Sequence, residues 1–92
     1  MKVTGTDGKE YTIEPAADLA DVDLSQANLG GADLRGADLT DVCLSRADLS
    51  GTNLNSANLS KADLTDSNLS GAVWNGETVF PEGFEIPDEL RG

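Results

Sequence analysis

Residues 27–51 read ANLGGADLRGADLTDVCLSRADLSG, and a leucine returns at every fifth position of this stretch. The same spacing continues on both sides. Twelve successive units carry a large apolar residue at the same place, namely Leu19, Leu24, Leu29, Leu34, Leu39, Leu44, Leu49, Leu54, Leu59, Leu64, Leu69 and Trp74. A small residue stands two positions before each, and the residue between them is Asp or Asn in ten units, the exceptions being Cys43 and Val73. The chain is therefore a tandem repeat, and the repeat decides the fold.

Neither regular secondary structure accommodates an uninterrupted period of five residues. On an α-helix five residues advance by about 140° net, so the leucines would spiral around the axis. In a straight strand an odd period places alternate leucines on opposite faces. The chain must therefore turn once in each unit. The small residue and the leucine point inward from a short extended piece, the polar residue between them points outward, and the last two residues form the turn.

Residues twenty positions apart resemble one another, which indicates how many units complete one coil. Gly31, Gly51 and Gly71 align at this spacing. Four units per coil give about three coils with four faces, and the backbone groups pair with the coils above and below, as buried polar backbone requires. The sequence thus predicts an all-β solenoid. One of its interior stacks is expected to consist of Leu24, Leu44 and Leu64.

The last residue of each unit lies in the turn, and glycine fills this place in two columns, at 31, 51 and 71 and at 36 and 76. These glycines predict type II turns, whose third residue has a positive φ. The other two columns begin with Asp21 and Asp41 and with Gln26 and Arg46. We expect another turn type there, because a positive φ is unfavourable for residues that carry a Cβ.

Units such as residues 32–36 (ADLRG) and 57–61 (ANLSK) resemble the repeats of the pentapeptide-repeat proteins, and the resemblance covers residues 17–76. It implies that family's fold, a right-handed quadrilateral β-helix with leucine at the centre of each face. Residues 78–84 (TVFPEGF) are also similar to a segment that follows the repeats in many cyanobacterial members. Some members are similar to DNA in shape and charge and inhibit or protect type II topoisomerases, whereas most have no assigned activity.

The flanks are predicted to cover the two ends of one domain, residues 1–92. Residues 1–16 form the N-terminal cap, 17–76 the twelve repeats and 77–92 the C-terminal cap. Strands at 2–6 and 9–13 around Asp7-Gly8 predict a β-hairpin, with Val3, Tyr11 and Ile13 against the first coil. At the other end, the side chains expected to close the last coil are Trp74, Phe80, Phe84 and Ile86. Residues 87–90 (PDEL) could start one helical turn.

The composition is acidic: 17 acidic and 6 basic residues give a net charge of −11. This charge disfavours direct binding to nucleic acid or to an anionic membrane. The single cysteine has no partner for an intrachain disulfide, and the first residues lack the apolar run of a signal peptide. No stretch has the length of a membrane span. We therefore expect a cytoplasmic protein.

The residue types argue against catalysis, so we predict no catalytic, cofactor-binding or metal-binding residues. The chain has no histidine, the commonest general base. Cys43 lies outward among acids, which disfavours the reactive thiolate. Asp18, Asp38 and Asn58 offer oxygen ligands for a hard cation as an alternative, but this position more often solvates the surface and bonds nearby backbone. The glycines match no phosphate-binding loop and are interpreted as turn residues.

Two functions remain open from the sequence. The first is a rigid, non-catalytic scaffold or interaction module for an unknown protein partner. The second is an acidic DNA mimic that acts on a DNA-binding enzyme. Three coils spaced by about 4.8 Å give a rod of only about 14 Å, or about four base pairs, which favours the scaffold. We expect a monomer with a capped end, and an end-to-end dimer through the C-terminal aromatic residues is the alternative.

Overall fold

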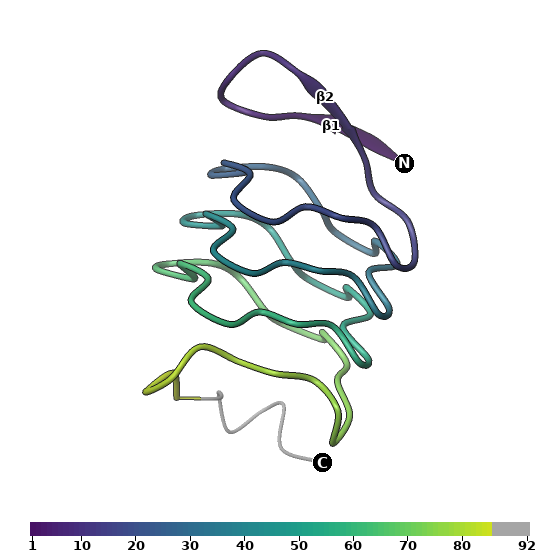
Figure 1. The fold of residues 1–92 in the computed structure, drawn as a ribbon, viewed down its shortest axis with the longest axis vertical. Coiled ribbons are helices and arrows are strands. Elements are labelled where there is room, and N and C mark those ends of the chain that lie inside the picture. Colours follow the sequence, from purple (N-terminus) through teal and green to yellow (C-terminus); the bar gives the residue numbers. More distant parts are fainter. Residues whose placement is uncertain (86–92) are drawn as a thin grey trace.

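A computed structural model describes residues 1–85 as a hairpin on top of a stack of coils (Figure 1). The hairpin consists of β1 (Lys2–Thr4) and β2 (Glu10–Thr12), which pair antiparallel with Val3 opposite Tyr11. From residue 17 onward, parallel β-bridges of one residue each join the coils, and successive partners lie 20 residues apart, as in Asp18, Asp38 and Asn58. The architecture is a β-helix, as the resemblance implied.

Each bridge joins the outward residues of two units. The Leu19 N–H donates to the Asp38 carbonyl at 2.8 Å, and the Asp38 N–H donates to the Ala17 carbonyl at 2.9 Å. The same pair of bonds recurs on every face, so the coils satisfy one another's backbone groups. The stacking of Leu24, Leu44 and Leu64 follows from the bridges that join Asp23, Cys43 and Asp63.

The interior is aliphatic, because the leucines of every coil point toward the axis of the β-helix. Leucines 19 to 59 are at most 2% exposed, and the alanines beside them fill the remaining space from Ala32 onward. Thr52 is buried at a position where alanine usually stands, and its hydroxyl donates to the Leu29 carbonyl at 3.0 Å. The buried hydroxyl is therefore satisfied, as burial of a polar group requires.

The same kind of turn ends the units of all four columns, so the expectation of two turn types was wrong. The carbonyl of each leucine accepts the N–H three residues later. The last residue of the unit has a φ of 66° to 71° at Gly31, Gly36, Gly51 and Gly71, and 59° to 64° at Asp21, Asp41, Gln26 and Arg46. Because all coils stack in register, tertiary pairing imposes this conformation even on residues that carry a Cβ.

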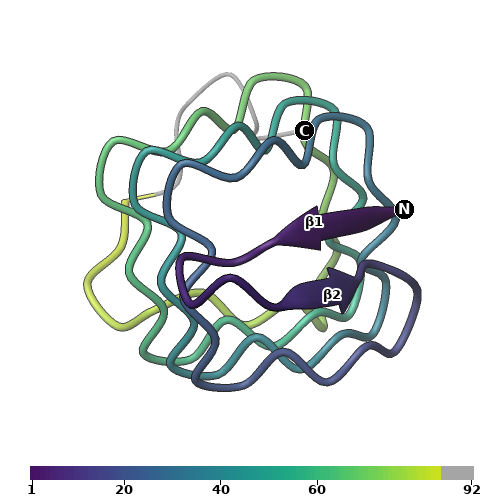
Figure 2. The ribbon, with the colours of Figure 1, turned by 90° about the horizontal axis from the view of Figure 1, so that it is seen from above.

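The N-terminal hairpin lies across the open end of the first coil (Figure 2). Ile13 is 3% exposed within the core, and Val3 and Tyr11 pack against it. One backbone bond ties the hairpin to the coil, from the Thr6 N–H to the Asp23 carbonyl at 3.2 Å. The expected hairpin and its apolar contacts are thus present.

The repeat continues beyond Trp74 with one extra residue. Asn58 bridges Val79, which lies 21 residues later, and Phe80 takes the place of the next leucine. The extra residue moves the turn, in which the Thr78 N–H donates to the Asn75 carbonyl at 3.1 Å, and the φ of Gly76 is not positive. The expected positive φ at Gly76 was therefore wrong.

Aromatic side chains lie at this end. Phe80 meets Trp74 edge-on at 5.7 Å between ring centroids and stacks on Phe84 at 5.4 Å. Both phenylalanines pack against the core, as expected of the C-terminal cap. Ile86 and the helical turn predicted at 87–90 lie outside the described residues.

Candidate functional surface

The outward Asp and Asn side chains make one repeated contact. In all ten units that carry them, the side-chain Oδ1 accepts the backbone N–H of the residue two positions later, at 2.9 to 3.3 Å. The ten residues are Asp18, Asp23, Asn28, Asp33, Asp38, Asp48, Asn53, Asn58, Asp63 and Asn68. This contact fixes the start of each turn and explains why Asp and Asn alternate freely, since both present the same oxygen.

Hydroxyl groups reinforce several of these contacts and lower the pKa of the aspartates. The Ser50 hydroxyl donates to Asp48 Oδ1 at 2.6 Å, which together with the Ser50 N–H lowers the pKa of Asp48. At Asp23 the Ser25 hydroxyl, the Ser25 N–H and the Thr6 hydroxyl lower the pKa from 3.8 to about 2. These carboxylates are stabilised as anions, which is opposite to what a general acid near neutral pH requires.

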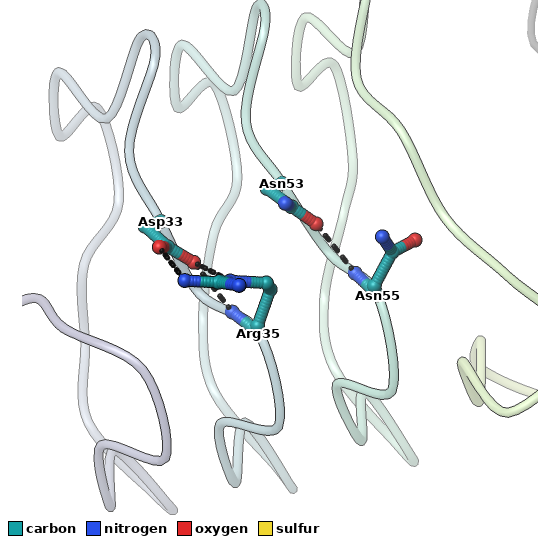
Figure 3. A network of polar contacts seen from close by, with 4 residues as sticks. All are labelled: Asp33, Arg35, Asn53 and Asn55. Atoms are coloured by element: carbon teal, nitrogen blue, oxygen red, sulfur yellow. Dashed lines mark hydrogen bonds and ion pairs between the residues drawn. The ribbon is translucent and has the colours of Figure 1, made fainter.

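One corner carries an ion pair instead of a hydroxyl (Figure 3). The Arg35 guanidinium donates through Nε and Nη2 to both Asp33 oxygens, at 2.8 and 2.7 Å. In the next coil Asn53 and Asn55 stand at the corresponding places, and Asn53 Oδ1 accepts the Asn55 N–H at 3.0 Å. Because Arg35 and Asp33 are about half exposed, the pair contributes little stability, but it neutralises the charge at this corner.

Cys43 stands in a column between Asp23 and Asp63 and is half-buried. Its Sγ lies 3.8 Å from the Ser25 Oγ and 3.7 Å from the Ser45 Oγ. The chain contains no histidine to activate the thiol. The arrangement is that of a small side chain that packs among hydroxyls.

The faces differ in charge. The acidic side, which we define as residues 18–23, 38–43 and 58–63, carries six aspartates against one lysine. The neutral side, residues 28–33, 48–53 and 68–73, carries two aspartates and no base. The sequence shows the total charge, but this separation follows only after the coils are stacked with a period of 20 residues.

Comparison with known families identifies the repeat. A sequence model described as "Pentapeptide repeats" matches residues 17–55 and 43–73, with eight copies. The chain belongs to the pentapeptide-repeat family. This confirms the resemblance seen in the sequence.

Two solved structures are similar to this pentapeptide-repeat protein. The first is the pentapeptide-repeat protein Rfr23 from the cyanobacterium Cyanothece 51142, with 35% identity and a TM-score of 0.71 over 72% of this chain and 45% of that chain. The second is alr5209, a pentapeptide-repeat protein from Nostoc Pcc 7120, with 41% identity and a TM-score of 0.49 over 76% of this chain and 66% of that chain. This chain thus spans less than half of the first relative. No curated protein matches it.

Within residues 1–85, the pentapeptide-repeat protein has no three acidic or cysteine side chains that converge to hold a metal ion. Asp18, Asp38 and Asn58 point outward along one face, and each Oδ1 bonds its own turn. The described part also has no helix long and apolar enough to cross a membrane.

A shallow hollow of about 320 Å³ lies between the last coil and the closing segment, lined by residues 62–65 and 81–84. Asp63 and Glu82 line the hollow with charged groups, and Leu64 and Phe84 form its apolar lining. The sequence did not predict this hollow, because it depends on how the segment after the extra residue crosses beneath the last repeats.

Proposed function

We propose that this pentapeptide-repeat protein is a non-catalytic scaffold that presents a rigid polar surface to a protein partner. The observation that carries the proposal is the use of the outward Asp and Asn side chains. All ten accept a backbone N–H of their own turn. Side chains held in this way form a fixed surface, and they do not converge on a reacting atom as catalysis requires.

The acidic side is the surface that we assign to the partner. Its six aspartates against one lysine favour a partner with clustered Lys and Arg side chains. The turn bonds keep these carboxylates in place before binding, which reduces the entropy lost on association.

The proposal also covers the shape of the molecule, its oligomeric state and its location in the cell. The four turns in each 20-residue spacing support a right-handed quadrilateral helix of about three coils. The hairpin at one end and the aromatic cluster at the other support one capped domain and a monomer. The net charge of −11 supports a cytoplasmic protein that binds neither nucleic acid nor a membrane.

A DNA mimic is the second candidate, and the separation of charge favours it. Its acidic side would imitate phosphates to an enzyme that binds DNA. The longest dimension of the molecule is 36 Å, about eleven base pairs at 3.4 Å per pair. However, the aspartates occupy only the coils between the caps, and Lys61 interrupts them.

A charge-matched pair of variants tests the scaffold. Asp38→Asn with Asp63→Asn removes two charges from the acidic side, and Asp33→Asn with Asp48→Asn removes two from the neutral side. Asparagine keeps the bond to the turn, as Asn28 and Asn58 show, so both variants should fold. In pull-downs from cell extract, the acidic-side variant should lose partners that the other retains, and equal losses would contradict the assignment.

A gyrase supercoiling assay distinguishes the two candidates. The scaffold leaves supercoiling unchanged at micromolar protein. Inhibition that weakens when Asp18 and Asp38 of the acidic side are replaced by asparagine would establish the DNA mimic instead.

A further inference from the structure

Asn75 is followed by Gly76, and no other asparagine of the chain is followed by glycine. The other five are followed by leucine or serine, namely Asn28, Asn53, Asn55, Asn58 and Asn68. A glycine has no side chain to keep its backbone nitrogen away from the preceding side-chain amide. We propose that Asn75 is a modification site, at which the Gly76 nitrogen attacks the side-chain carbon of Asn75 and the amide leaves as ammonia.

The local structure leaves this nitrogen accessible. Asn75 and Gly76 are both exposed, and beyond residues 75–77 no heavy atom lies within 4 Å of the place where a Gly76 Cβ would stand. The Gly76 N–H donates to no backbone carbonyl within residues 1–85. By contrast, the N–H groups that follow Asn28, Asn53 and Asn58 donate to the next coil at 2.7 to 2.8 Å. Stacking therefore protects those three asparagines, whereas Asn75 lies in the last coil, where the Gly76 N–H has no such partner within residues 1–85.

Two backbone N–H groups polarise the carbonyl that is attacked. Asn75 Oδ1 accepts from the Ser56 N–H at 3.0 Å and from the Glu77 N–H at 3.1 Å. Negative charge develops on this oxygen when the nitrogen adds to the carbon. Donors already aimed at it stabilise that charge, as in an oxyanion hole.

The reaction needs only water and balances as follows. A hydroxide or water takes the Gly76 amide proton, the nitrogen bonds to Asn75 Cγ, and the Cγ–Nδ2 bond breaks. The leaving nitrogen takes a proton from water and departs as ammonia, which leaves a five-membered succinimide. Water then opens the ring at either carbonyl, so position 75 becomes an aspartyl or an isoaspartyl residue.

The product weakens the closure of the last coil. Asn75 Nδ2 donates to the Ser56 Oγ at 3.3 Å, and this hydroxyl donates to Glu77 at 3.1 Å. The new carboxylate loses that donor and adds a charge near Glu77. An isoaspartyl residue also lengthens the backbone just before Val79, whose N–H and carbonyl bond to Ala57 and Leu59 at 3.0 and 2.7 Å.

Peptide mapping by mass spectrometry tests the proposal on the full-length folded protein, incubated at mildly alkaline pH in ¹⁸O-labelled water. We expect the peptide containing residue 75 to exchange its amide for a labelled carboxylate at least about tenfold faster than peptides with the other asparagines. Amide exchange at Val79 should rise in step with the isoaspartyl fraction. Equal stability of all six asparagines would overturn the proposal.

Two variants separate the chemistry from a change of fold. Gly76→Ala meets no neighbour and needs no positive φ, so it should fold normally and slow the reaction at Asn75. Ser56→Ala removes the hydroxyl but keeps the N–H at Asn75 Oδ1, and the reaction should continue. An unchanged rate in Gly76→Ala, or arrest in Ser56→Ala with the fold intact, would contradict the mechanism.

Discussion

The second coil, residues 37–56, and the third coil, residues 57–76, have the same repeat but different burial. In the second coil Val42, Leu44 and Leu49 are 0% exposed, whereas in the third Leu64 and Leu69 are 7% and 6% exposed. The interior residues of the two coils are chemically alike, so the difference in exposure comes from what packs above and below each coil. The second coil has complete coils on both sides, while the third is followed by a closing segment whose register is shifted by one residue.

The largest effect is expected at the centre of the second coil. Leu44→Ala leaves a cavity between two complete coils and should cost about 2 to 5 kcal/mol of unfolding free energy. Thermal and denaturant unfolding measure this loss. Ser45→Ala, next to it on the outside, is the control, and equal losses in the two variants would show that the leucine does not face the interior.

Leu64→Ala tests the comparison directly, because Leu64 lies in the same interior stack one coil further. It is 7% exposed and lies at the hollow beneath the last coil. We expect a smaller loss than at Leu44, since a site near the end can relax into part of the space that the side chain leaves. A loss equal to that of Leu44→Ala in the same denaturant series would mean that the end of the helix packs as tightly as its middle.

A change at the corners should cost the same in both coils. Gly51→Ala and Gly71→Ala place a Cβ at φ values of 66° and 71°, where it meets only ordinary contacts. Each should lose about 1 to 2 kcal/mol from backbone strain alone. Arg46 already carries a Cβ at a φ of 59°, so Arg46→Ala adds no backbone strain and should be nearly neutral. Urea unfolding that shows a larger loss at Gly51 than at Gly71 would mean that the corners also depend on neighbouring coils.

The smallest effect concerns pH. The pKa of Asp23 is about 2 in the folded protein and 3.8 in the unfolded reference. A depressed folded-state pKa stabilises the fold above the unfolded value, and this contribution is lost as the pH falls from about 4 to about 2. Asp23→Asn keeps the turn bond but cannot titrate, so its stability should fall less over this range. Parallel acid titrations monitored by circular dichroism provide the measurement.

The interior could be predicted from the sequence because its signal is redundant. Twelve units repeat one pattern, and a residue such as Leu44 is placed by its neighbours in the repeat as much as by its own chemistry. The outward position was also interpreted correctly, since Asp and Asn bond the backbone of their own turn, a contact that requires only local chain geometry. The hairpin around Asp7-Gly8 followed from local turn preference for the same reason.

The two wrong predictions both concern the backbone at turns, where tertiary contacts override the local preference of the residue. Asp21, Asp41, Gln26 and Arg46 adopt a positive φ that their own preferences oppose, because the bonds to the coils above and below hold every corner alike. Gly76 does not adopt one, because the extra residue moves the turn. A local rule about glycine could predict neither result.

The sequence by itself determined the period, the inward leucine and the acidic total, since each is a property of single units or of their sum. Only the tertiary structure decided which aspartates share the acidic side, how the register shifts at Val79, and which asparagines are followed by an N–H that bonds the next coil. The physical reason is that these features depend on contacts between residues about 20 positions apart. Such contacts form when coils stack, and a single extra residue changes all that follow it.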